Sequence, residues 1–280
     1  MIEDILLYYS DQRNIHKLRT YLPHNFCEQA ADAVLKHVGK VLITTGFWVA
    51  GTCETDGPIG AIVLADVLTE LRADPVFVTD CYCAEVLRRC CQYRVIDFPI
   101  TSHEESLAIA RSILAEEHPS LLISIERCGM SQDGHYYNMR RVDVSEYTAK
   151  VDYLFLEFPA SIGIGDGGNE IGMGNLTDAI AAEALPIAPC VTCVEYPVIA
   201  TVSNWAAYGM IAYLSQKQQR DYMRYVTVRE ILTQLVAEGV VDGVLKEPVM
   251  SVDGFAIDAI EAVVASLRKE VEPFLTGIPG

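Results

Sequence analysis

The chain has 280 residues, 51% of them hydrophobic, and a mean hydropathy of +0.21, so it can bury a sizeable core and is not intrinsically disordered. Its formal net charge of −17 disfavours contact with nucleic acid and with anionic membrane surfaces. The amino-terminal residues do not resemble a signal peptide, and no run reaches the ~18 apolar residues of a membrane span. We therefore expect a cytoplasmic protein.

Nine cysteines in a chain without a recognisable export signal indicate free thiols rather than a disulfide framework. Cys190 and Cys193 have the C-x-x-C spacing found in zinc sites, but such sites need a second pair or two spaced histidines. Every histidine lies at or before His135. We therefore expect the buried thiols to act as small hydrophobic side chains.

Short apolar runs alternate with segments of helical periodicity through most of the chain. The runs predict six strands, at residues 41–46, 75–80, 94–100, 121–126, 161–165 and 196–203. This alternation predicts an α/β fold with a doubly wound, mostly parallel sheet and helices on both faces, a three-layer Rossmann-like arrangement.

Helical periodicity predicts helices in the segments between and around these strands. They are residues 1–37, 60–71, 83–91, 102–118, 175–185, 204–217, 221–238 and 256–270. Ser102 and Glu105 have the spacing of a capping box. Because no linker or repeat interrupts the pattern, we expect one domain (1–280). Its expected parts are an N-terminal helical segment (1–38), a core sheet with its loops (39–210) and C-terminal helices (211–280).

Parallel sheets bind ligands outside the carboxyl ends of their strands, so the segments that follow the strands are the candidates for a site. Four of them are polar or rich in glycine: residues 46–60, 126–141, 165–174 and 203–209. Their convergence at one edge of the sheet is stronger evidence for a site than any single motif.

The segment SIGIGDGGNEIGMGN, residues 161–175, contains the spacing G-x-G-x-x-G at Gly163, Gly165 and Gly168. In a dinucleotide-binding loop these glycines let the backbone approach a pyrophosphate. Here Asp166 and Glu170 carry negative charge at the positions where the phosphates would lie, which argues against a nucleotide.

The same carboxylates suit a hard divalent cation such as Mn²⁺ or Mg²⁺, because these ions prefer oxygen ligands. The alternative is a surface turn in which Asp166 or Asn169 caps the following helix and Glu170 lies in its first turn. From the loop alone both interpretations stay open.

Six segments in the same order resemble the D-glutamate cyclase C-terminal family, formerly a domain of unknown function. They are ETDGPIGA (54–61), IERCG (125–129), GHYYNMR (134–140), GIGDGGNEIGMG (163–174), VSNWAAYG (202–209) and DGV..EP (242–248). The vertebrate member of the family is longer and carries an extra N-terminal domain, so the chain looks like a stand-alone prokaryotic form.

The resemblance implies a lyase that dehydrates D-glutamate, or a related acidic amino acid, to 5-oxo-D-proline with the help of a divalent cation. A metal-dependent phosphatase on the same loops is one alternative, and a non-enzymatic protein that binds a small anionic metabolite is another. Exposed apolar surface on the terminal helices can support a homodimer.

For this reaction we assign Asp166 and Glu170 to the metal, with Glu126 as a third ligand or as the catalytic base. Glu126 ends a buried strand, where sheet proteins hold catalytic groups. The alternative for Glu126 is a structural ion pair with Arg127 or Arg140.

Asp56 is the second candidate base, or a partner of the substrate ammonium. Glu54, Thr55 and Gly57 are predicted substrate contacts, with Gly57 offering its N–H to a carboxylate at a helix start. The alternative is a turn in which Thr55 or Asp56 caps a helix that begins at Pro58.

Further candidate substrate contacts lie in the other loops, and they are Asn138, Arg140, Asn169 and Asn204. A substrate with two carboxylates needs a cationic partner, and Arg140 and Arg141 are the candidates for it.

Overall fold

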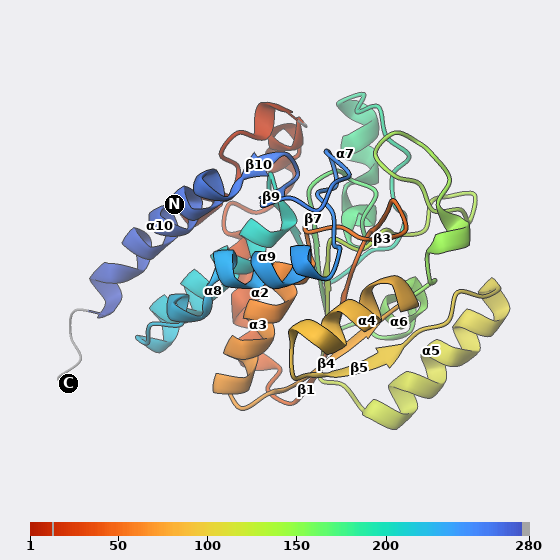
Figure 1. The fold of residues 1–280 in the computed structure, drawn as a ribbon, viewed down its shortest axis with the longest axis horizontal. Helices are drawn as coiled ribbons and strands as arrows, with labels where there is room; N and C mark the ends of the chain where they lie inside the picture. Colours follow the sequence, from red (N-terminus) through yellow and green to blue (C-terminus); the bar gives the residue numbers. More distant parts are fainter. Residues whose placement is uncertain (13, 276–280) are drawn as a thin grey trace.

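The computed structural model describes residues 1–12 and 14–275, and a six-stranded parallel sheet forms its centre (Figure 1). The strands are β1 (Lys40–Thr45), β4 (Asp74–Thr79), β5 (Arg94–Asp97), β6 (Leu121–Ile125), β7 (Ser161–Gly165) and β8 (Tyr196–Ile199). Their order is β5-β4-β1-β6-β7-β8, so the chain begins in the middle and winds outward to each edge in turn. The predicted doubly wound fold is confirmed, and all six strands of this sheet are parallel.

Helices cover both faces of the sheet (Figure 1). One face carries α2 (Phe26–Lys36), α3 (Pro58–Glu70), α4 (Cys81–Cys90) and α8 (Ser203–Gln218), with α1 (Ile2–Leu6), α9 (Val228–Ala237) and α10 (Ile257–Leu275) packed on this layer. The other face carries α5 (His103–Glu117) and α6 (Asp152–Glu157). A further short helix, α7 (Thr177–Ala182), follows β7.

The strands are apolar on both faces because each face is covered by helices. Side chains alternate between the two faces along a strand. Val41 and Ile43 of β1 pack into the core under α3 and α8, whereas Leu42 between them packs into the core under α5 and α6. This double burial explains why the sequence shows continuous apolar runs.

Two small hairpins stand at the carboxyl edge of the sheet and contribute to the rim of a cavity described below. The first follows β1 and consists of β2 (Trp48–Val49) and β3 (Thr52–Cys53). The second precedes α10 and consists of β9 (Ser251–Val252) and β10 (Phe255–Ala256). Neither hairpin is predicted from the sequence.

Two of the predicted helices differ from the structure. The N-terminal helical segment is interrupted, since Pro23 separates a 3₁₀ segment, Ile15–Tyr21, from α2. The helix predicted at 221–238 begins only at Val228, because α8 ends at Gln218, the next residue Gln219 is left-handed, and a short 3₁₀ turn follows. The predicted capping box at Ser102 and Glu105 is confirmed. No helix in the described part of the chain combines the length and apolar character needed to cross a membrane.

Candidate active site

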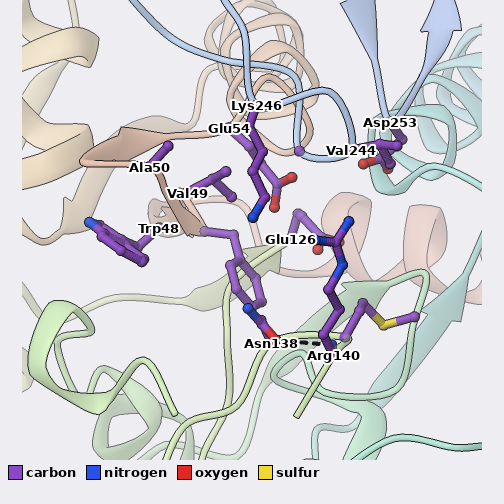
Figure 2. A pocket seen from close by; sticks show the side chains of 13 residues that line it. Trp48, Val49, Ala50, Glu54, Glu126, Asn138, Arg140, Val244, Lys246 and Asp253 are labelled. Atoms are coloured by element: carbon purple, nitrogen blue, oxygen red, sulfur yellow. Dashed lines mark hydrogen bonds between the residues drawn. The ribbon is translucent and has the colours of Figure 1, made fainter. Parts of the chain in front are cut away.

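A cavity of about 220 Å³ opens at the carboxyl edge of the sheet (Figure 2). This edge includes the gap between β1 and β6, where the winding direction of the chain reverses and where sheets of this kind bind ligands. Residues from three regions line the cavity: Phe47, Trp48, Val49, Ala50 and Glu54 after β1, then Glu126, Asn138, Met139 and Arg140 after β6, then Gly243, Val244, Lys246 and Asp253 near the C-terminus. Two of the four predicted loops, those after β1 and β6, therefore line the cavity, whereas the loops after β7 and β8 contribute none of its lining residues and the third region is not among those predicted.

Three buried carboxylates come together beside this cavity. Asp56 lies before α3, Glu126 follows β6, and Asp166 follows β7. One oxygen from each lies within 4.8 Å of the others, a spacing that suits a single cation. Carboxylate oxygens are the ligands that Mg²⁺ and Mn²⁺ prefer, so these residues fit the divalent cation that the family resemblance implies.

Glu126 has an unusual backbone and a perturbed carboxyl group. Its φ of 46° is uncommon for a residue other than glycine. Its side chain accepts a hydrogen bond from the Ser203 hydroxyl at 2.6 Å. Burial raises the pKa of the Glu126 carboxyl well above its usual range. The charges of four neighbouring carboxylates raise this pKa further, and the largest of these four effects comes from Asp166. This concentration of buried negative charge is what a bound cation would offset.

The alternative for Glu126, an ion pair with Arg127, is wrong. The Arg127 guanidinium is buried and donates to Asp80 at 2.5 Å, and it also donates to the carbonyl oxygens of Gly46 and Ala149. Arg127 therefore ties the end of β6 to the ends of β1 and β4, and it leaves the Glu126 carboxylate directed toward the cation group.

Asp56 and Asn204 cap each other's helices. The Asp56 carboxylate accepts hydrogen bonds from the N–H groups of Ser203 and Asn204 at the start of α8, at 2.7 and 2.8 Å. The Asn204 carboxamide oxygen accepts from Gly57 and Gly60 at the start of α3, at 3.0 and 2.6 Å. Both helices therefore begin at the candidate site, held there by side chains from the opposite helix start.

These contacts correct the predicted role of Gly57. Its N–H donates to Asp56 and Asn204 and does not face a ligand. The residue is glycine for a steric reason, since its φ is 93° and an added Cβ would lie 2.5 Å from the Thr45 hydroxyl. Gly57 thus brings the start of α3 close to the strand ends.

The glycine-rich loop folds around its own carboxylate. Glu170 accepts hydrogen bonds from the N–H groups of Gly167 and Gly168, at 3.0 and 2.7 Å. These are the donors that a phosphate in this loop would use, so the nucleotide interpretation is excluded. Glu170 is consequently turned onto its loop, and it is not part of the carboxylate group formed by Asp56, Glu126 and Asp166.

The capped-turn alternative for this loop is also wrong. The residues at the N-cap positions of the 3₁₀ segment Met173–Leu176 and of helix α7 are Gly172 and Leu176, not Asp166 or Asn169, and neither makes a side-chain capping bond. Asn169 instead donates from its carboxamide to the Tyr137 carbonyl at 2.9 Å, which joins the loop after β7 to the loop after β6. The loop therefore contributes Asp166 to the carboxylate group and is joined to the loop after β6, rather than capping a helix.

The predicted substrate contacts fall into two groups. Glu54, Asn138 and Arg140 line the cavity, whereas Thr55, Gly57, Asn169 and Asn204 are not among its lining residues. Thr55 is buried and donates its hydroxyl to the Ser251 carbonyl at 3.0 Å. The polar groups of the second set make hydrogen bonds within the protein, and these bonds hold the loops around the cavity in place.

Lys246 and Asp253 line the cavity from the C-terminal region, and sequence reasoning did not propose Lys246. The available signal was its position within the motif DGV..EP, where it is the one basic residue. Arg141, proposed beside Arg140, instead donates to the Ile187 carbonyl outside the cavity. All nine cysteines are free, and no group of cysteines among the described residues has the arrangement of a metal site.

A doubly wound parallel sheet with buried carboxylates beside a cavity at its switch point defines an α/β protein whose candidate ligand site lies at the carboxyl ends of the strands. The chain belongs to the D-glutamate cyclase-like, C-terminal family, whose model matches residues 2–268.

A curated relative agrees with this assignment. The chain is 32% identical over 208 residues to the protein named D-glutamate cyclase, mitochondrial, from Homo sapiens, and the match covers 66% of the chain. It covers 34% of the human protein, so the chain spans about a third of the length of this relative.

Proposed function

We propose that the protein is a lyase that, assisted by a divalent cation, closes D-glutamate into 5-oxo-D-proline with the loss of water. The observation that carries the proposal is the group of three buried carboxylates beside a small cavity that also contains two cationic side chains. Membership of the D-glutamate cyclase-like family and the human relative support the same substrate class.

Asp56, Glu126 and Asp166 would hold Mn²⁺ or Mg²⁺. When bound, such a cation polarises the γ-carboxylate of the substrate and stabilises the negative charge that develops on its oxygen. Asp56 replaces Glu170 in the ligand set that we infer from the sequence, because Asp56 belongs to the group of carboxylates whose oxygens lie within 4.8 Å of one another and Glu170 does not.

Ring closure joins the amine nitrogen to the carbon of the γ-carboxylate and expels one oxygen of that carboxylate. The ammonium group gives up two protons, and both leave on that oxygen as water, so no other reactant is needed. We assign the proton transfers to Glu54 and Glu126, two carboxylates that face the cavity (Figure 2). Asp56 is not assigned as a base, because its carboxylate is occupied by backbone N–H groups of α3 and α8.

The apolar side of the cavity suits the carbon chain of glutamate. Phe47, Trp48 and Val49 line it, and Trp48 is stacked on Tyr147 with ring centroids 4.0 Å apart. This stacking holds one wall in position, and a fixed wall helps to bring the amine and the carbon of the γ-carboxylate together.

Product analysis tests the proposal. The purified protein is incubated with Mn²⁺ and either D-glutamate, L-glutamate or a generic phosphate ester, with Glu126→Gln as the matched control. We expect 5-oxo-D-proline from D-glutamate with the wild type and at least about a hundredfold less with the variant. Phosphate release without 5-oxoproline would contradict the proposal and favour a phosphatase. Thermal stabilisation by D-glutamate without turnover would favour a binding protein.

A further inference from the structure

Two cationic side chains project into the cavity from opposite walls, namely Arg140 from the loop after β6 and Lys246 from the C-terminal loop (Figure 2). In so acidic a chain many cationic groups are bound by carboxylates, as Lys217 is by Glu28 and Asp32. None of the ion pairs between described residues includes Arg140 or Lys246. Both head groups are therefore available to an anionic ligand.

The turn that carries Arg140 is fixed by Asn138. The Asn138 carboxamide oxygen accepts hydrogen bonds from the N–H groups of Arg140 and Val142, at 2.9 and 3.1 Å. Its main chain pairs with Val142 and Arg141 as well. Asn138, which we expect from the sequence to contact the substrate, thus positions Arg140.

The turn that carries Lys246 is fixed in the same way by Asp242, which is fully buried. One Asp242 carboxylate oxygen accepts from the N–H groups of Val244 and Leu245, both at 2.8 Å. Its main-chain oxygen accepts from the Lys246 N–H at 2.7 Å. Lys246 has a φ of 59°, so the turn holds a residue with a long side chain in a conformation that favours glycine.

We infer that Arg140 and Lys246 form a clamp that binds the α-carboxylate of the substrate, an inference that rests on the proposed function. Both residues are exposed at the mouth, whereas the cation group is buried beside the cavity. The γ-carboxylate must lie by the buried group, because it is the one that reacts. The α-carboxylate does not change in the reaction, so we place it at the mouth, where Arg140 and Lys246 bind it.

The clamp makes the site selective for molecules that carry a second carboxylate. Glutarate and butyrate test this without turnover, because they differ by one carboxylate and neither can cyclise. Arg140→Met and Lys246→Met remove the two cationic groups. Arg141→Met is the matched control, since the Arg141 guanidinium contacts the Ile187 carbonyl outside the cavity.

Binding of both ligands is measured by NMR titration in the presence of Mn²⁺. We expect the wild type and Arg141→Met to bind glutarate at least about tenfold more tightly than butyrate. In Arg140→Met and in Lys246→Met this preference should be lost, while butyrate binding stays unchanged. A wild type without the preference, or variants that keep it, would overturn the clamp.

Kinetics separate the clamp from the proposed function. On D-glutamate the two variants should raise KM by at least about tenfold and change kcat little, and on 4-aminobutyrate, which lacks the α-carboxylate, they should match the wild type. Turnover of D-glutamate with an unchanged KM in both variants would overturn the clamp and leave the proposed function intact. A glutarate preference that depends on Arg140 and Lys246 without any turnover would support the clamp and overturn the proposed function.

Discussion

Asp56 and Asn204 are 148 residues apart in the sequence, yet each caps the helix that the other begins. The exchange fixes the starts of α3 and α8 against each other at the edge where the carboxylates gather. A residue that we infer to hold a cation is thus also part of the frame of the fold.

Removing the Asn204 carboxamide should destabilise the protein. Asn204→Leu leaves the N–H groups of Gly57 and Gly60 buried without this acceptor, and we expect the free energy of unfolding to fall by about 2–4 kcal/mol. Urea unfolding of Asn204→Leu, Asp56→Asn and the double variant measures the coupling. The two effects should be non-additive by at least about 1 kcal/mol, and simple additivity would contradict the reciprocal cap.

Glu126→Gln should abolish activity and preserve the fold. The amide oxygen of glutamine can still accept the hydrogen bond from the Ser203 hydroxyl. The amide group, however, cannot act as a base, and it lacks the negative charge with which the carboxylate would bind a cation. We expect kcat/KM to fall by about 10³-fold. The cation-free variant should unfold at no lower urea concentration than the wild type, because one charge is removed from a crowded carboxylate cluster. A marked loss of stability would mean that Glu126 is chiefly structural.

The buried pair of Arg127 and Asp80 should be essential for stability. Arg127→Met leaves the Asp80 carboxylate buried without its cationic partner, and this costs about 3–5 kcal/mol. Urea unfolding checks the value, and the double variant with Asp80→Leu should recover part of the loss. A loss below about 1 kcal/mol would show that the pair does not anchor the end of β6.

The strand positions follow from the sequence because burial on both faces leaves continuous apolar runs. β7 occupies Ser161–Gly165, the predicted range, and the capping box at Ser102 marks the start of α5. The location of the site at the strand ends follows from the topology of a parallel sheet.

The details of the site depend on contacts that no local pattern records. The pairing of Asp56 with Asn204 joins distant segments, and Lys246 reaches the cavity only because Asp242 fixes its turn. Glu170 and Asp166 both carry a carboxylate and lie in the same loop, yet Glu170 folds back on Gly167 and Gly168. Glycine-rich loops have many accessible conformations, so the sequence does not distinguish these two carboxylates.

Glu117 at the end of α5 predicts a pH dependence of stability. Its carboxylate is bound first by Arg94 and then by Lys40, which lowers its pKa. Because the folded state has the lower pKa, this stabilisation is present above the usual glutamate pKa of about 4.3 and is lost as the pH falls through the folded-state value.

Glu117→Gln should therefore lower the free energy of unfolding by about 1 kcal/mol at pH 7, and the difference from the wild type should shrink toward zero in acid. Urea unfolding from pH 7 down to about pH 2 measures it, because the difference is lost below the usual glutamate pKa of about 4.3. Glu116→Gln is the control, since Glu116 accepts only the Ser112 hydroxyl and its pH profile should follow the wild type. A constant difference across this range would contradict the assignment.

A titration of Mn²⁺ into cation-free protein tests the central claim most directly. Bound Mn²⁺ is followed by electron paramagnetic resonance while 5-oxo-D-proline formation from D-glutamate is measured in the same samples. We predict that the rate rises in proportion to the bound cation, and that Asp166→Asn shifts both curves to at least about tenfold higher Mn²⁺. Full activity in the presence of a chelator, or an Asp166→Asn variant with both curves unchanged, would contradict a cation-assisted cyclase at this site.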